Sequence, residues 1–133
     1  MTRRQARELA LQTLFSIELG KHEPPSALDD ALARPDIGGE DAFVRELVLG
    51  TLDHAEYSDQ TVAPLLQNWT LERIPTVDRL ILRMAVYEMR HCSETPRAVV
   101  INEAVELAKK FSTEDSGRFV NGVLSNVGES GAA

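Results

Sequence analysis

The chain has 133 residues, of which 43% are hydrophobic and 26% charged, a composition typical of one globular domain rather than a disordered or fibrous protein. It contains one cysteine and so has no disulfide framework, which favours a reducing, cytoplasmic setting. No apolar run approaches the roughly 18 residues of a membrane span, and the first residues lack the apolar core of a signal peptide. Membrane and extracellular roles are therefore not expected.

The formal net charge of −7 is unevenly distributed along the chain. Residues 20–63 contain three basic and ten acidic residues, whereas residues 1–19 carry a net charge of +1 and residues 64–133 of −1. Because the excess negative charge is confined to one segment, a local basic face could still hold a polyanion. The charge does not exclude nucleic acid as a partner.

About seven helices are predicted by the spacing of apolar residues and by the positions of proline, glycine and capping residues. Their expected bounds are 3–19, 24–34, 40–57, 58–68, 76–92, 96–111 and 112–127. Ser58 and Thr76 are the expected caps of the fourth and fifth helices. Since no stretch shows the alternation of a strand, we expect an all-α single domain over 1–127, followed by a disordered tail over 128–133.

One row of the first helix lies opposite its apolar stripe and combines positive charge with apolar groups. Its members are Arg4, Arg7, Leu11 and Phe15. Arginines in such a row can neutralise phosphates, and an exposed aromatic ring beside them can stack on an unpaired base. Alternatively, the arginines are only solvated and Phe15 packs under a neighbouring helix. Because cations in the first turn oppose the helix dipole, Arg3 and Arg4 disfavour the helix, which tips the balance slightly towards a binding role.

The helix expected over 76–92 is apolar around most of its circumference and should be the most buried one. Arg79 and Arg83 fall within a narrow arc, most simply a solvent-facing stripe. Asp78 and Glu88 lie on the apolar side and need partners if they are buried, either within the bundle or on another protein.

Residue patterns of catalytic, cofactor and metal sites are missing from the sequence. Neither of the glycine-rich phosphate-binding motifs, G-x-x-x-x-G-K-S/T and G-x-G-x-x-G, occurs in the sequence. His22, His54 and His91 are scattered, without a second ligand at metal spacing. We therefore expect no enzyme activity, no cofactor and no metal.

Four stretches of the chain resemble the NusB family of bacterial transcription antitermination factors. They are Arg3–Phe15, Val77–Glu88, Ala98–Lys109 and Phe111–Leu124. The most specific strings are Ile-Asn-Glu-Ala-Val-Glu-Leu-Ala-Lys at 101–109 and Phe-Val-Asn-Gly-Val-Leu at 119–124. The stretches include the N-terminal helix and most of the second half of the chain, but the acidic middle matches poorly, so the resemblance implies nothing about residues 20–63.

The resemblance implies two small helical bundles packed together, and a protein that binds the single-stranded boxA element of nascent ribosomal-RNA leaders. It would do so with the ribosomal protein NusE, in a complex that keeps RNA polymerase transcribing. By matching position, the implied RNA contacts are Arg3, Arg4, Arg7, Gln12, Phe15, Arg83, Asp115 and Phe119. Asp78 and Arg79 would lie near the NusE contact. Relatives are monomers or homodimers, and both states stay open.

Phe15 stands where relatives often have tyrosine, so it can stack or pack but cannot offer a hydroxyl group. Phe119 lies at the edge of the last helix's apolar side, where a core role is the simpler interpretation. The RNA-binding role also requires that the first arginines are not consumed by the protein's own acids. Two alternatives remain: a helical adaptor that binds only protein, and a detached relative of the RNA-binding domains fused to RNA methyltransferases.

Overall fold

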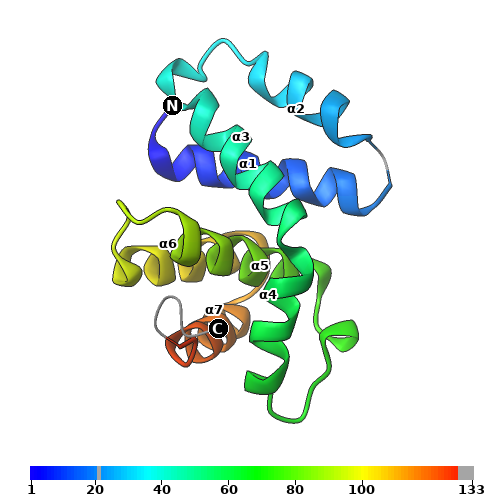
Figure 1. Cartoon of the computed structure of the whole chain (residues 1–133), viewed down its shortest axis with the longest axis vertical. Coiled ribbons are helices and arrows are strands. Elements are labelled where there is room, and N and C mark those ends of the chain that lie inside the picture. The colour runs from blue at the N-terminus through cyan, green and yellow to red at the C-terminus, as the bar shows by residue number, and fades with distance from the viewer. Residues whose placement is uncertain (21, 129–133) are drawn as a thin grey trace. The chain divides into compact units, whose positions relative to one another are not determined.

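The computed structural model describes residues 1–20 and 22–128, and within them it contains seven α-helices and no strand, which confirms the all-α prediction. The helices, labelled in Figure 1, are α1 (Arg3–Glu18), α2 (Pro24–Leu32), α3 (Asp41–Asp53), α4 (Ala55–Val62), α5 (Thr76–His91), α6 (Arg97–Phe111) and α7 (Glu114–Ser125). Short 3-10 turns lie at η1 (Gly38–Glu40), η2 (Ala63–Leu65) and η3 (Leu71–Arg73). None of the helices in the described ranges has the length and apolar character needed to cross a membrane.

The chain forms two compact units, Met1–Leu52 and Asp53–Ala133. The first holds α1, α2 and most of α3, and the second holds α4 to α7. The expected single domain over 1–127 stays a prediction. Of the expected tail over 128–133, only Gly128 lies within the described residues.

The first unit begins with a well-capped helix. The Thr2 hydroxyl accepts a hydrogen bond from the Gln5 backbone N–H at 3.1 Å, and the Gln5 side chain accepts one from the Thr2 N–H at 2.8 Å. Helix α1 ends just before Gly20, whose φ of 73° suits glycine, as its position in the sequence predicts. The unit's core is apolar and consists of Ala6, Leu9, Ala10, Leu14, Ala27, Leu28, Val44, Leu47 and Val48, with the ring of Phe43.

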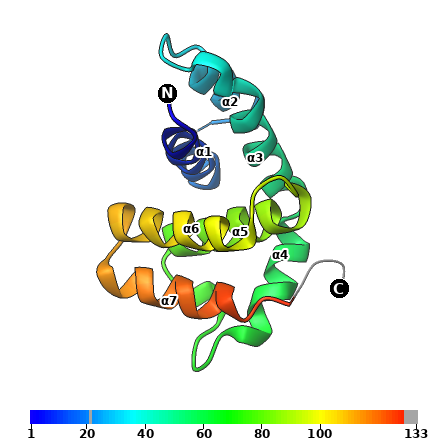
Figure 2. The ribbon, with the colours of Figure 1, turned by 90° about the vertical axis from the view of Figure 1, so that its left-hand side faces the viewer.

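The second unit is built around α5, which is buried from Leu80 to Glu88 except at Arg83, as its apolar circumference predicts. Helices α6 and α7 run side by side after it (Figure 2). Gly117 permits this close approach, because a Cβ atom there would be 2.9 Å from Cγ of Lys109.

The middle of the chain departs from the predicted helix bounds. The helix expected over 40–57 ends at Asp53, because His54 leaves helical geometry with φ −109° and ψ 17°. Its ring lies 5.4 Å from the Tyr87 ring and 4.4 Å from the His91 ring, so long-range ring contacts accompany the break. Ser58, expected as a cap, is fully buried inside α4.

The caps of α5 and α7 are Pro75 and Thr113. Pro75 occupies the cap position of α5, so Thr76 is its first helical residue and makes no capping bond. Thr113 caps α7 and accepts a hydrogen bond from the Ser116 backbone N–H at 2.9 Å.

Candidate nucleic-acid interface

Arg3 begins α1 at the surface but is engaged within the first unit. Its Nε lies 2.6 Å from Oε1 of Glu40, and its guanidinium carbon lies 3.9 Å from the centre of the Phe43 ring. The requirement that the first arginines stay out of ion pairs with the protein's own acids is therefore not met at Arg3. The Arg3 side chain is 48% exposed but that of Glu40 only 19%, so the pair is partly buried and a phosphate would have to compete with Glu40 for Arg3.

The prediction of an exposed row on α1 is wrong for its two central residues, Arg7 and Leu11. Arg7 is 5% exposed and Leu11 2% exposed, so neither is on the surface. The Arg7 guanidinium carbon lies 5.3 Å from the centre of the Phe43 ring, which comes from α3. This contact spans 36 residues of chain, and the periodicity of α1 alone could not reveal it. In the same row Arg4 is exposed and Phe15 is partly buried.

Gln12 is exposed on α1 beside a shallow pocket between α1 and α2. Ser16 and His22 also line it, with the Ser16 hydroxyl 2.7 Å from Nδ1 of His22. Nε2 of the same ring lies 3.3 Å from Asp30. Gln12 is thus on the surface, as its predicted RNA contact requires.

Arg83 on α5 was expected to face solvent, but it is paired with an acid and partly buried. Its Nε and Nη2 donate to the two carboxylate oxygens of Asp59 on α4, at 2.8 Å and 2.7 Å. The two side chains are 19% and 28% exposed, so this two-pronged pair joins α4 to α5 in a partly buried setting. Arg79 is also partly buried and donates to the Leu71 carbonyl at 3.3 Å.

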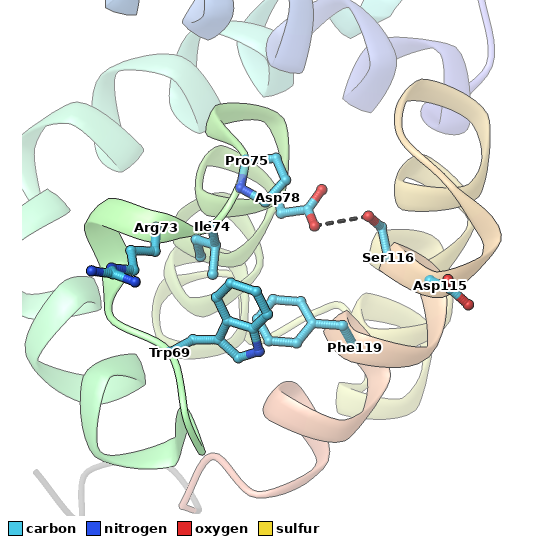
Figure 3. A pocket seen from close by; sticks show the side chains of 8 residues that line it. All are labelled: Trp69, Arg73, Ile74, Pro75, Asp78, Asp115, Ser116 and Phe119. Carbon is cyan, nitrogen blue, oxygen red and sulfur yellow. Dashed lines mark hydrogen bonds between the residues drawn. The ribbon is translucent and has the colours of Figure 1, made fainter.

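A pocket of about 360 Å³ lies in the second unit, between the segment preceding α5, the start of α5 and the start of α7 (Figure 3). It is lined by Trp69, Arg73, Ile74, Pro75, Asp78, Asp115, Ser116 and Phe119. Two predicted RNA contacts, Asp115 and Phe119, thus share one pocket with Asp78, which was predicted for the protein partner.

Asp78 is held inside this pocket rather than on an open face. It is 3% exposed, and its Oδ2 accepts a hydrogen bond of 2.8 Å from the Ser116 hydroxyl. Its Oδ1 is buried and has no hydrogen-bond partner within the described part of the chain. A buried acceptor left in this state costs about 1–3 kcal/mol of stability.

Asp115 and Phe119 follow one another by one helical turn on α7. Asp115 is exposed and forms an ion pair with Arg118. Phe119 is partly buried and turns its ring towards the pocket (Figure 3). It is therefore neither a fully buried core residue nor a free surface ring.

Trp69 is one of the pocket residues that the sequence interpretation missed, together with Arg73, Ile74, Pro75 and Ser116. It is the single tryptophan of the chain, and it is 55% exposed. Asn68 before it adopts φ 67°, a left-handed conformation that asparagine tolerates better than most residues. The signal available was an Asn-Trp pair in a stretch without helical periodicity, just ahead of the buried α5.

No group of three or more histidine, cysteine or acidic side chains that could hold a metal occurs within the described ranges. His54 and His91, distant in sequence, do meet, but with Tyr87, whose ring is 4.8 Å from that of His91. They form an aromatic cluster.

The comparisons with known proteins agree with this architecture. The NusB family profile matches residues 4–129. The transcription antitermination protein NusB of Geobacillus kaustophilus is 50% identical over 127 residues, covering 96% of this chain and 95% of the relative. A solved structure of T. maritima NusB superposes with a TM-score of 0.87 at 31% identity, covering 96% of this chain and 90% of that one. A structure described as antitermination factors NusB and NusE in complex with dsRNA gives 0.81 at 29% identity, covering 96% and 97%.

Proposed function

This chain belongs to the NusB family of transcription antitermination proteins, and we propose that it acts by binding the boxA element of nascent ribosomal-RNA leaders together with NusE. It is a non-enzymatic protein of this family. In the proposed role, the RNA-bound pair joins the RNA polymerase complex in the bacterial cytoplasm and keeps transcription processive. The oligomeric state, monomer or homodimer, stays open.

One observation carries this proposal. The matched structure that contains NusE and dsRNA aligns with nearly the whole of this chain, at a TM-score of 0.81. A fold conserved over that length supports the same kinds of partner for this protein. The partners themselves are proposed here on the basis of that relative.

The residues divide into phosphate-binding and base-binding groups. Arg3, Arg4 and Gln12, exposed on α1, supply cationic and polar contacts to the RNA backbone, with Phe15 beside them. Phe119 supplies a ring on α7. Such a combination of cations and rings suits a single strand, because the bases of a duplex are already stacked.

Three predicted residues take less direct parts. Arg7 supports the interface from its buried position, and Arg83 reaches a phosphate only when its pair with Asp59 opens. Asp115 likewise must exchange its partner Arg118 for a donor on the RNA. For the protein partner, Arg79 and the start of α5 form the proposed contact, with Asp78 acting from inside the pocket.

The test is a fluorescence-anisotropy titration of labelled boxA RNA, with a scrambled RNA as control, in the absence and presence of NusE. We expect weak, salt-sensitive binding by the protein alone and tighter binding with NusE, because the partner adds surface. Arg4→Ala should weaken binding several-fold, since it removes a cation. The matched control is Arg45→Ala, which removes another exposed arginine, on α3.

Failure to bind boxA RNA under both conditions would contradict the proposal. Binding to NusE without any RNA binding would identify a protein-only adaptor instead. Equal losses in Arg4→Ala and Arg45→Ala would show that net charge, not the α1 surface, attracts the RNA.

A further inference from the structure

The connection between α6 and α7 consists of only two residues, Ser112 and Thr113. Both carry hydroxyl groups, which lie 2.9 Å and 3.1 Å from the hydroxyl of Ser116. Ser116 is 7% exposed, and its own hydroxyl donates to Oδ2 of Asp78 on α5 at 2.8 Å (Figure 3). These four side chains, here called the Asp78 cluster, join α5 to the start of α7.

The direction of every bond in the Asp78 cluster follows from its carboxylate. A carboxylate only accepts hydrogen bonds, and a serine hydroxyl has one proton to donate. The Ser116 proton is committed to Asp78, so the Ser116 oxygen accepts from both Ser112 and Thr113. The Thr113 oxygen in turn accepts from the Ser116 backbone N–H at 2.9 Å, which is the capping bond of α7. One acceptor on α5 thus orients all three hydroxyls of the turn.

Packing alone does not require such a cluster. It leaves Oδ1 of Asp78 buried without a hydrogen-bond partner in the described part of the chain, whereas apolar residues at positions 78 and 116 would leave no unpaired polar atom. Hydrogen bonds demand particular distances and angles, which apolar contacts do not. The Asp78 cluster therefore fixes the geometry of the turn more strictly than apolar packing would.

The Asp78 cluster holds one side of the start of α7, and α6 holds another. On the side of α6, a Cβ atom at Gly117 would lie 2.9 Å from Cγ of Lys109, so the two helices are already in close contact there. On the side of α5, the Ser116 hydroxyl provides the polar attachment. Asp115 precedes Ser116 and Phe119 follows it by about one helical turn, so both proposed RNA contacts are placed by this attachment.

We propose that Asp78 and Ser116 are positioning residues for the RNA surface. Their hydrogen bond fixes the first turn of α7 against α5 and so presents Asp115 and Phe119 to the RNA, while neither Asp78 nor Ser116 touches it. This role rests on the proposed RNA-binding function and adds the pair that orients two of its contacts.

The test compares two buried hydroxyls of the second unit. Ser116→Ala removes the hydroxyl at the centre of the Asp78 cluster. The matched control Ser58→Ala removes a fully buried hydroxyl of α4 that has no hydrogen-bond partner within the described residues. In anisotropy titrations of labelled boxA-like RNA, Ser116→Ala should lose roughly three- to tenfold in affinity, the equivalent of one hydrogen bond. Ser58→Ala should lose none.

Two further readouts separate positioning from a general loss of structure. Ser116→Ala removes no charge, so the salt dependence of its RNA affinity should keep the slope of the wild type. Its affinity for NusE should stay within about twofold, because the proposed protein contact lies on α5, whose own burial is unaffected. A general defect would instead lower both affinities, together with the folded fraction seen by circular dichroism.

Variants of Asp78 test the acceptor itself. The amide oxygen of Asp78→Asn can still accept the Ser116 proton, so this variant should keep most of the RNA affinity that Asp78→Ala loses. Combining Asp78→Ala with Ser116→Ala should lower RNA affinity little further than either change alone, since both break the same bond.

The outcomes separate the two proposals. RNA binding by the wild type and equally tight binding by Ser116→Ala would overturn the positioning role and leave the proposed function standing. Absence of RNA binding by the wild type would overturn both. Equal losses of RNA and NusE affinity, or fully additive losses in the double variant, would also overturn the positioning role. If Ser116→Ala fails to fold, Ser112→Ala in the turn takes its place, and unchanged RNA affinity in that variant would overturn the role.

Discussion

The two units of the chain use charged side chains in opposite ways. In Met1–Leu52, cations lie on or near the surface of α1, and the acid Glu40 and the ring of Phe43 hold the first of them. In Asp53–Ala133, the carboxylate of Asp78 is buried, and only one of its two oxygens is hydrogen-bonded. Phosphate contacts position a nucleic acid, whereas base contacts specify its sequence. In the proposed function, the cations of α1 therefore position the RNA, and Phe119 of the second unit contacts a base.

The comparison also shows that net charge is a poor guide to how much positive charge is exposed. Arg3, Arg7 and Arg83 each add one positive charge to the sequence. In the structure, however, Arg3 is paired with Glu40 and Arg83 with Asp59. Arg7 is buried. Charge therefore has to be counted where it is exposed. The following variants separate structural from RNA-binding arginines.

The largest effect is expected from Arg7→Ala in the first unit. This substitution removes a side chain that is 5% exposed and lies over the Phe43 ring, so it should cost about 2–3 kcal/mol of unfolding free energy. Denaturant unfolding measures this cost. Arg4→Ala is the control and should change stability by less than about 0.5 kcal/mol. If the two variants are equally stable, Arg7 has no structural role.

A smaller effect is expected from Asp59→Asn in the second unit. The substitution weakens the pair with Arg83, which is partly buried, and should lower the unfolding free energy by about 1–2 kcal/mol. It also releases a cation, so RNA affinity at low salt should rise if Arg83 contributes to binding. Stability lost without any gain in RNA affinity would leave Arg83 as a purely structural residue.

Glu40→Gln should lower the unfolding free energy by about 1 kcal/mol or less, because Arg3 is half exposed although Glu40 is only 19% exposed. The released Arg3 should increase RNA affinity several-fold. Anisotropy titrations of the wild type and the variant at one salt concentration measure the difference. Unchanged affinity would remove Arg3 from the RNA contacts.

The smallest effect concerns Tyr57, whose hydroxyl accepts a hydrogen bond from Nε of Arg90 at 2.9 Å. This bond holds the pKa of the Tyr57 phenol below its ordinary value of 10.0. The folded state thus favours the ionised phenol, and the contribution of Tyr57 to stability should grow as the pH rises from the lowered pKa towards 10.0. Ultraviolet titration in a Tyr87→Phe background should show ionisation at lower pH than in Tyr87→Phe with Arg90→Met.

The fold was largely predictable because local signals agree with it. Gly20 and Pro24 bound α1 and α2, and the apolar circumference of α5 predicts its burial. The break at His54 was missed because neither glycine nor proline marks it. Its ring contacts with Tyr87 and His91 join residues more than 30 positions apart.

The candidate site was predictable only in part. The resemblance alone pointed to Asp115 and Phe119, which line one pocket, whereas the helical pattern favoured a core role for Phe119. Arg7 lies against Phe43, which is 36 residues further along the chain. The pocket around Phe119 includes Trp69, which is also distant from Phe119 in the sequence. Periodicity within one helix carries no information on such contacts.

The proposed RNA-binding role is tested most directly by the salt dependence of RNA binding in three proteins: the wild type, Arg4→Ala and Phe119→Ala. With about three to five phosphate contacts, the logarithm of the binding constant should fall with the logarithm of salt concentration at a slope of roughly −2 to −3.5. Arg4→Ala should reduce that slope by about 0.7, whereas Phe119→Ala should weaken binding and keep the slope, because it removes a ring and no charge. An unchanged slope in Arg4→Ala, or unchanged affinity in Phe119→Ala, would contradict the account.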